Sequence, residues 1–289
     1  MSRSRALRRF LANRGAVVGA VLVLLVVMSA LAASWLSSTD PLRLDLDRGL
    51  TALGAPVGPG ADFPLGSDAL GRDVWSRLVH GASISLQVAV MATAIALTLG
   101  LLVGLVAGYA GGWVDQVLMR LVDLVLAFPF LLLAILLAAL LRQTSIGDGT
   151  APVFITLGVV GWTTMARVVR GKVLTLREME FVQAARAVGA RPSRILVKHL
   201  LPNVVGVVVV LATLGFAQNI LAESVLSYLG LGPPPPAPTW GRMLYEGQVY
   251  YRTSPWLIIA PGAAILIAVV SFNLLGEGLR DALDPKERR

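Results

Sequence analysis

Long apolar stretches alternate with shorter polar segments along the 289 residues of the chain. A bilayer core is about 30 Å thick and needs roughly 20 apolar residues per helix, so long stretches poor in charge mark the expected spans. Barrel strands would instead show segments of about 10 residues with alternating polarity. The pattern predicts an all-α integral membrane protein with six transmembrane helices. The expected spans are 16–36, 83–108, 115–141, 152–169, 203–229 and 256–276.

The composition supports this fold class and excludes several kinds of site. Hydrophobic residues make up 56% of the chain and charged residues 15%, which a water-soluble core of this size could not hide. Cysteine is absent and there are two histidines, too few for a typical zinc cluster. Stretches that would cradle phosphate or carry out hydrolysis, such as Gly-x4-Gly-Lys-Ser/Thr and Gly-x-Ser-x-Gly, are missing. We therefore expect no catalytic residue, no cofactor and no metal in this chain.

The positive charges predict how the chain is oriented in the membrane. The formal net charge is +8, but Arg and Lys flank the apolar stretches rather than forming one soluble face, so we expect no nucleic acid partner. Seventeen of them fall in the two tails and the loop at 167–202, against seven in the segments between. Positive residues are retained on the cytoplasmic side, so both termini are predicted to be cytoplasmic. The expected organisation is a basic tail at 1–15, a first helix at 16–36, an external segment at 37–80, a five-helix core at 81–280 with a cytoplasmic loop at 171–202, and a tail at 281–289.

The first span has an alternative interpretation as a cleaved signal peptide. A basic region precedes it, and Ala30-Leu31-Ala32 resembles a cleavage site. Its apolar stretch exceeds the roughly 7–15 residues of a signal-peptide core, which favours an uncleaved anchor.

The loop between the fourth and fifth spans is the most informative polar segment. Residues 176–188 favour a helix, Gly189 suits the left-handed position after a helix, and Pro192 suits the first residue of another. Small side chains in the first helix would let the surface of another protein approach closely. We therefore expect two short helices joined by a bend, and a docking surface; an ordinary amphipathic loop is the alternative. The small residues are Ala184, Ala185 and Ala187.

This loop resembles the EAA loop of ABC importer permeases. Gln183-Ala184-Ala185 is followed by Gly189 and by Leu201-Pro202 at the family's spacing, although Gln183 replaces the usual glutamate. The resemblance implies that the loop is the coupling helix, which seats in a cleft of the ATP-binding subunit. The residues it implies in ATPase coupling are Gln183, Ala184, Ala185, Arg186, Gly189, Leu201 and Pro202.

A second stretch, at 65–77, resembles the beginning of the second span in dipeptide and oligopeptide permeases. Its glycines permit tight turns, and its aspartates can accept backbone hydrogen bonds and pair with neighbouring arginines. We expect a structural cap over the mouth of the pore, with direct substrate contact as the alternative. The candidate residues are Gly66, Asp68, Gly71, Arg72 and Asp73. Further matches to these permeases lie at 108–115, 127–129, 221–224, 229–232 and 278–285.

Several residues within the spans carry expectations of their own. Glu223 is the one acidic residue deep in a span, where an unpaired charge costs about 3 kcal/mol, and we expect it to anchor the following loop rather than bind solute. Pro129 predicts a kink in the third span, either a gating hinge or a harmless bend. Arg120 and Asp123 have the spacing of a local helical pair. Glycines at four-residue spacing predict close helix packing: Gly100, Gly104 and Gly108.

Together these resemblances imply a permease with the type I ABC importer fold in the bacterial inner membrane. Such a chain forms half of a translocation pore for dipeptides or oligopeptides and does not itself hydrolyse ATP. Its implied partners are a second homologous permease, two ATP-binding subunits that hold ATP and magnesium, an extracytoplasmic solute-binding protein and the lipid bilayer. Nickel chelates and haem are alternative cargoes. An ion-coupled secondary transporter is the rival class, and it would need more carboxylates or matched broken helices within the spans.

Overall fold

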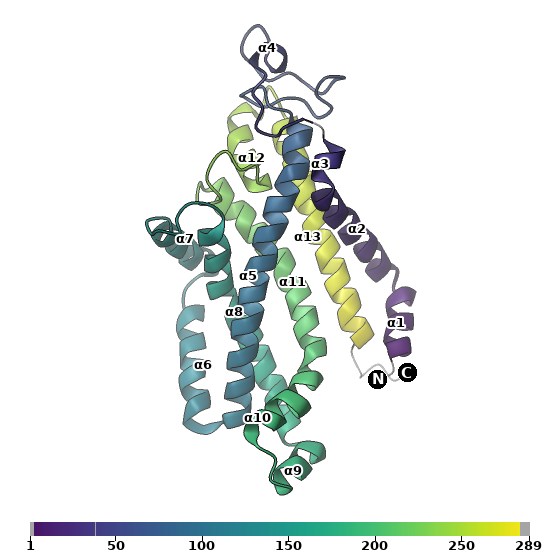
Figure 1. The fold of residues 1–289 in the computed structure, drawn as a ribbon, viewed down its shortest axis with the longest axis vertical. Helices are drawn as coiled ribbons and strands as arrows, with labels where there is room; N and C mark the ends of the chain where they lie inside the picture. Colours follow the sequence, from purple (N-terminus) through teal and green to yellow (C-terminus); the bar gives the residue numbers. More distant parts are fainter. Residues whose placement is uncertain (1–2, 38, 284–289) are drawn as a thin grey trace.

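A bundle of long helices makes up the part of the chain that the structure describes, residues 3–37 and 39–283 of a computed structural model (Figure 1). Within these residues there are isolated β-bridges but no β-strand. The α-helices are α1 (Arg3–Ala12), α2 (Arg14–Leu31), α3 (Ala33–Leu36), α4 (Leu46–Gly49), α5 (Val74–Ala110), α6 (Gly112–Leu126), α7 (Phe130–Leu141), α8 (Ala151–Arg177), α9 (Glu180–Ala187), α10 (Pro192–Arg194), α11 (Leu201–Tyr228), α12 (Trp240–Gly247) and α13 (Trp256–Leu283). A π-helical turn, η1 (Ile195–Leu200), joins α10 to α11, and a 3₁₀ turn, η2 (Gln248–Tyr250), follows α12.

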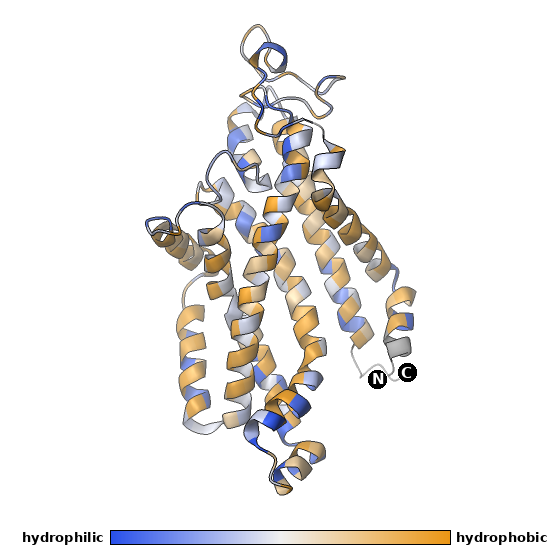
Figure 2. Ribbon diagram, viewed as in Figure 1, coloured by the Kyte–Doolittle hydropathy of each residue, from blue (hydrophilic) through white to orange (hydrophobic). Residues whose placement is uncertain are grey.

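Five of the described helical segments are long and apolar enough to cross a membrane: α2, α5, α8, the continuous α10–α11 segment and α13. A sixth span is possible only as the pair α6 and α7, whose axes are bent by 88°. Figure 2 shows these helices as mostly hydrophobic, with hydrophilic residues gathered around α9, α10 and α4. The all-α membrane fold expected from the sequence is therefore confirmed.

The third span is not the single helix expected at 115–141. The chain leaves the helix after Leu126, and Pro129 adopts an extended conformation before α7 begins. Proline lacks an amide hydrogen and disfavours a helical conformation in the residue before it, so the helix ends here. The kink expected at Pro129 is confirmed, but the prediction of one continuous helix is wrong.

The second span begins earlier than expected because Asp73 caps α5. Its carboxylate accepts hydrogen bonds from the amides of Trp75 at 3.2 Å and Ser76 at 3.1 Å, two of the donors that a helix start leaves free. Helix therefore replaces the last residues of the segment expected to be an external loop at 37–80.

Glycines bring α5 and α8 into close contact, as their spacing predicted. A Cβ atom at Gly100 would lie 2.5 Å from Cβ of Met165, and one at Gly104 would lie 2.7 Å from the carbonyl oxygen of Ala166. At Gly108 it would lie 2.7 Å from Cβ of Val173. All three glycines face α8, so larger side chains would force the two helices apart.

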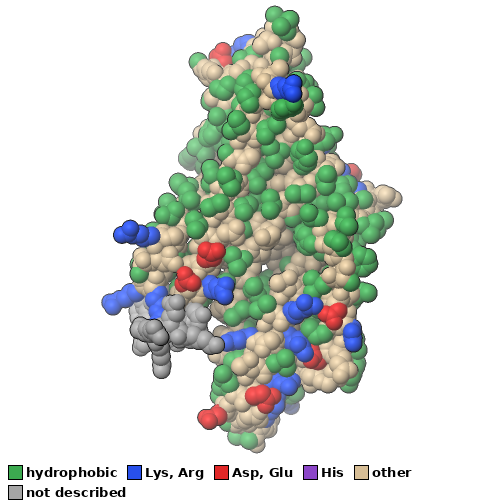
Figure 3. Space-filling model, turned by 180° about the vertical axis from the view of Figure 1, so that it is seen from behind, with side chains coloured by type: hydrophobic (Ala, Val, Ile, Leu, Met, Phe, Trp, Pro, Cys, Tyr) green, Lys and Arg blue, Asp and Glu red, His purple; other side chains and the backbone are tan. Residues whose placement is uncertain are grey.

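The first and last long helices also pack together. Gly19 of α2 lies against Leu274 of α13, and the Asn13 amide donates to Asp281 at 3.0 Å. Figure 1 shows α1, the end of α13 and α9 toward one end of the molecule, and α4 and α12 toward the other. Seen from behind, hydrophobic side chains cover the middle, and charged side chains gather toward the α9 end (Figure 3). Which end faces the cytoplasm stays a prediction from the charge distribution.

The orientation can be tested with single cysteines, because the chain contains none of its own. Leu53 is 96% exposed at the α4 end, and Arg186 is exposed on α9. We expect a membrane-impermeant thiol reagent to label Leu53→Cys in intact cells, and to label Arg186→Cys only after the membrane is permeabilised. Labelling of Arg186→Cys in intact cells would overturn the predicted topology.

Candidate functional site

The segment expected to dock on an ATP-binding subunit forms two short helices joined by a bend at the α9 end. Gly189 adopts φ of +77°, which favours glycine. Its amide donates to the carbonyl of Arg186 at 2.9 Å, and the Ala190 amide donates to the carbonyl of Ala185 at 3.0 Å. This pair of bonds is the Schellman motif that ends many helices. Pro192 then begins α10, so the turn at Gly189 and the second helix are as predicted, but the helix expected at 176–188 is interrupted at residues 178–179, between α8 and α9.

The buried side of α9 includes one of the small residues that were expected to face another protein. Val182 is fully buried and Ala185 is 8% exposed, and both pack with Ile195 and Leu200 of η1. The expectation that Ala185 faces another protein is therefore wrong, because its side chain lies in this chain's own core. The exposed residues of α9 and of the C-cap that follows it are Glu180, Phe181, Gln183, Ala184, Arg186, Ala187 and Val188. Of the other coupling candidates, Pro202 is exposed and Leu201 is half-buried at the start of α11.

Contacts tie this segment to the adjacent end of α5. The guanidinium of Arg186 lies 5.1 Å from the ring centroid of Tyr109, a distance that suits a cation–π contact. Arg177 donates to the carbonyl of Gly108 at 3.1 Å, and the Gln183 amide donates to the carbonyl of Arg177 at 3.2 Å. A force applied to α9 would therefore reach α5 as well as α8.

Ion pairs join α6 to α8 near the same end. Arg170 binds Asp115 at 2.6 Å, and Arg167 binds Asp123 at 2.8 Å. The expected pair of Arg120 with Asp123 does not form, because an arginine on the neighbouring helix takes that carboxylate instead.

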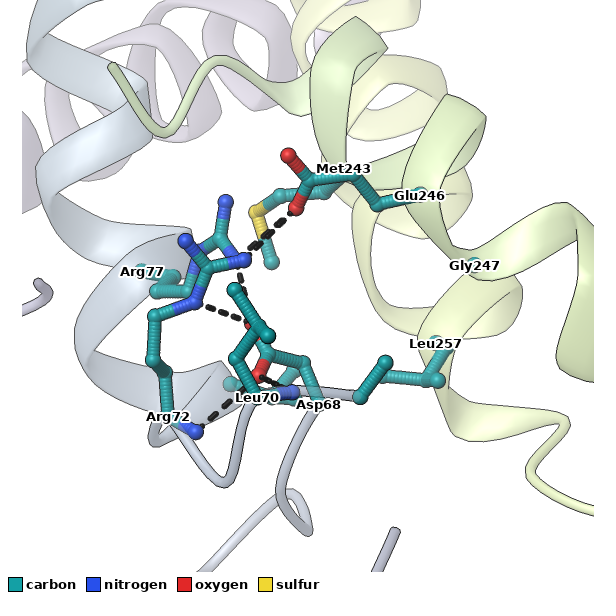
Figure 4. A pocket seen from close by; sticks show the side chains of 10 residues that line it. Asp68, Leu70, Arg72, Arg77, Met243, Glu246, Gly247 and Leu257 are labelled. Atoms are coloured by element: carbon teal, nitrogen blue, oxygen red, sulfur yellow. Dashed lines mark hydrogen bonds and ion pairs between the residues drawn. The ribbon is translucent and has the colours of Figure 1, made fainter. Parts of the chain in front are cut away.

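At the opposite end two of the cap candidates, Asp68 and Arg72, form a cluster of ion pairs with Arg77 and Glu246 (Figure 4). Asp68 accepts from Nε of Arg72 at 2.7 Å and from Arg77, whose side chain is 1% exposed. Glu246 of α12 binds Nη2 of Arg72 at 2.8 Å and Nη1 of Arg77 at 2.9 Å. A cavity of about 240 Å³ lies beside the cluster. The cluster thus joins the segment before α5, α5 itself and α12.

The cap glycines hold this segment in tight turns. Gly66 and Gly71 have φ of +81° and +71°. A Cβ atom at Gly66 would lie 2.5 Å from the indole nitrogen of Trp256, which donates to the carbonyl of Ser67 at 3.1 Å. The turns therefore pack the cap against the start of α13. Asp73 caps α5 instead of pairing with an arginine.

Sequence reasoning missed Glu246 and the short helix that carries it. Burial raises the pKa of Glu246, but the charges of Arg77 and Arg72 and the hydrogen bond from Arg242 outweigh it and lower this pKa below its ordinary value. Arg242 and Glu246 are four residues apart and 2.9 Å from each other. That spacing is the signal that could have indicated α12.

Glu223 is fully buried among hydroxyl groups. Ser227 donates to one carboxylate oxygen at 2.6 Å and Ser85 of α5 donates to the other at 3.1 Å. Thr239, in the loop that follows α11, donates to the Ser227 hydroxyl at 3.3 Å. Among the described residues no arginine or tyrosine binds Glu223. The geometry agrees with anchoring of this loop, a role that stays a prediction.

Comparisons with known proteins agree with the arrangement. Residues 100–289 match the family described as binding-protein-dependent transport system inner membrane component, and residues 3–55 match the N-terminal TM domain of oligopeptide transport permease C. The chain is 43% identical over 283 residues to the oligopeptide transport system permease protein OppC of Escherichia coli, covering 98% of this chain and 91% of that protein. It is 39% identical over 281 residues to the dipeptide transport system permease protein DppC of Alkalihalophilus pseudofirmus, covering 97% and 89%.

Two further matches extend this comparison. The glutathione transport system permease protein GsiD of Escherichia coli is 40% identical over 280 residues, covering 96% of this chain and 89% of that protein. A solved structure of the MetNI methionine ABC transporter in an inward-facing conformation gives a TM-score of 0.60, at 21% identity, over 73% of this chain and 98% of that one. At this identity the likeness concerns the fold alone.

The ion cluster predicts a large difference between two Asp→Asn changes. Asp68→Asn leaves Glu246 as the one carboxylate paired with two buried arginines, Arg72 and Arg77, and we expect this loss of charge balance to lower the free energy of unfolding by about 3 kcal/mol. Asp45→Asn removes the partner of Arg48, whose side chain is 62% exposed, and we expect no measurable change. Unfolding in detergent micelles, followed for both variants and the wild type, measures the difference. Equal stability of the two variants would show that the cluster does not hold the cap.

Proposed function

The chain belongs to the family of binding-protein-dependent transport system inner membrane components, and on this basis we propose that it forms half of a translocation pathway for dipeptides or oligopeptides. A multi-pass permease of an ABC importer works in a complex with a partner permease and with ATP-binding subunits. ATP hydrolysis belongs to those subunits. The inner membrane of a bacterium is its location, with both termini in the cytoplasm.

The names of the relatives support a peptide cargo. One is named for oligopeptide transport, one for dipeptide transport and one for transport of glutathione, which is itself a tripeptide. Each covers nearly the whole chain, so the likeness includes the cap and the helices around it. Peptides are therefore the cargo we propose ahead of nickel chelates and haem.

The exposed face of α9 is the observation that supports coupling most strongly. It lies at the tip of the molecule, is held by the turn at Gly189, and is tied to both α5 and α8. A short helix presented in this way suits docking into a cleft of an ATP-binding subunit. Ala184 offers a small exposed side chain that lets the two surfaces approach, and Arg186 and Val188 flank it.

The opposite end is the proposed docking surface for a solute-binding protein. The segment around α4 projects beyond the long helices, and the ion cluster joins it to α12 (Figure 1). A binding protein that contacts this segment would press on the start of α5 through the cap. We propose that Gly66, Asp68, Gly71, Arg72 and Asp73 serve as this structural cap and that Glu223 anchors the adjacent loop.

The coupling role predicts that bulk on the exposed face of α9 blocks transport. Ala184→Trp should reduce ATP-driven uptake of tri-alanine about tenfold or more, because a steric clash in a well-packed contact costs about 1–3 kcal/mol. The measurement uses proteoliposomes that contain the chain, its partner permease, the ATP-binding subunits and the binding protein. Co-purification of the ATP-binding subunits with the variant should fall in parallel.

Leu24→Trp is the matched control. Leu24 is 59% exposed on α2, far from α9, so added bulk there should change neither assembly nor uptake. If Ala184→Trp keeps its ATP-binding subunits and transports like the wild type, α9 is not the coupling element. If the wild-type complex takes up haem or a nickel chelate and no peptide, the proposed cargo is wrong.

A further inference from the structure

A cavity of about 520 Å³ lies between α5, α8, α11 and the break between α6 and α7. Its polar side chains come from near the middle of α5 and α8 and from the α11 segment before Glu223. No charged side chain lines it, and its remaining wall is apolar or glycine, including Phe128 and Phe130 on either side of Pro129. The polar residues of the wall are Thr93, Thr163, Thr164, Gln218 and Asn219.

Two of these side chains form a hydrogen-bonded pair that can still bind a third group. Asn219 is 6% exposed, and its amide nitrogen donates to the hydroxyl of Thr93 at 3.0 Å. Because the Thr93 hydroxyl accepts this bond, its own hydrogen can be donated elsewhere, and the Asn219 carbonyl oxygen can accept. Thr98, on the same helix, instead donates to the carbonyl of Ala94 at 2.7 Å.

The chemistry of the wall fits a peptide backbone. A peptide group presents one N–H donor and one C=O acceptor close together, which complement the Asn219 carbonyl and the Thr93 hydroxyl. Amide and hydroxyl groups in an apolar surrounding are costly unless they are hydrogen-bonded, so the buried Asn219 carbonyl and the half-buried Thr93 hydroxyl favour a polar occupant of the cavity. A wall without charged side chains does not favour one sign of charge on the cargo over the other.

We infer that this cavity is a binding position on the translocation pathway. It binds the amide groups of the peptide backbone and admits anionic, neutral and cationic peptides alike. The inference rests on the proposed function. Asn219 and Thr93 position a peptide group, and Gln218, which is exposed and lines the cavity, is a neutral position where an introduced charge would act on a passing side chain.

Charge changes at Gln218 test this directly. Uptake of Ala-Glu-Ala, Ala-Ala-Ala and Ala-Lys-Ala is measured in proteoliposomes that contain the complete complex. Relative to wild type, Gln218→Glu should raise the ratio of Ala-Lys-Ala to Ala-Glu-Ala uptake about fivefold, and Gln218→Lys should lower it by a similar factor. The same two changes at Gln143, in the loop after α7, should leave the ratio unchanged.

The hydroxyl of Thr93 is tested with a matched pair of variants. Thr93→Val should lower uptake of all three peptides about tenfold, because the buried side-chain amide of Asn219 loses its hydrogen-bond partner and the peptide loses the Thr93 hydroxyl. Thr98→Val makes the same chemical change on the same helix outside the cavity and should transport like the wild type. Thr93→Ser restores the hydroxyl and should recover uptake, which separates binding from a defect in folding.

The outcomes distinguish this inference from the function on which it rests. If the wild-type complex takes up none of the three peptides, the proposed function fails and the inference fails with it. If the wild type transports peptides but the Glu and Lys variants of Gln218 do not shift the ratio in opposite directions, the cavity is not on the pathway. Equal uptake by Thr93→Val and Thr98→Val would show that the Asn219–Thr93 pair does not bind the backbone.

Discussion

The close contact between α5 and α8 is the interaction on which the rest of the structure depends. Lipid tails are as apolar as the side chains they meet, so helices in a bilayer associate through close packing rather than through the hydrophobic effect. Gly100, Gly104 and Gly108 make that packing possible by leaving room for the backbone of α8. The end of α8 leads into α9, the proposed docking helix, and the start of α5 carries the proposed cap. One helix pair therefore connects the two functional ends.

Most charged groups that form ion pairs lie toward the two ends of the bundle, because an unpaired charge within the bilayer is costly. The Asp68 and Glu246 cluster lies at the α4 end, and the Asp115 and Asp123 pairs lie toward the α9 end. Glu223, the exception, is enclosed by serine hydroxyls. The cavity between them is lined by neutral groups alone. Ion pairs thus hold the two ends in shape, and the cavity between them has the neutral surface that the proposed cargo of variable charge would require.

Much of the fold could be predicted because span length, glycine spacing and the turn at Gly189 are local properties of the sequence. The rest depends on contacts between distant residues. Glu246 meets Arg72 across 174 positions of the chain, and Ala185 turns inward because η1 packs against it. Pro129 indicates that a helix is interrupted, but the 88° bend depends on how α7 packs against α8. Sequence periodicity alone does not show which side of a short helix is buried, or the angle between two helices that a break separates.

Peptide uptake per ATP hydrolysed, compared for Gly104→Ala and Gly171→Ala in the reconstituted complex, tests most directly whether the α5–α8 contact joins the two ends. Both variants gain the same helix propensity, but a Cβ atom at Gly104 collides with α8 whereas one at Gly171 meets no atom within 4 Å. We predict that Gly104→Ala hydrolyses ATP with little uptake and that Gly171→Ala keeps the wild-type ratio. A wild-type ratio in both variants would contradict the account.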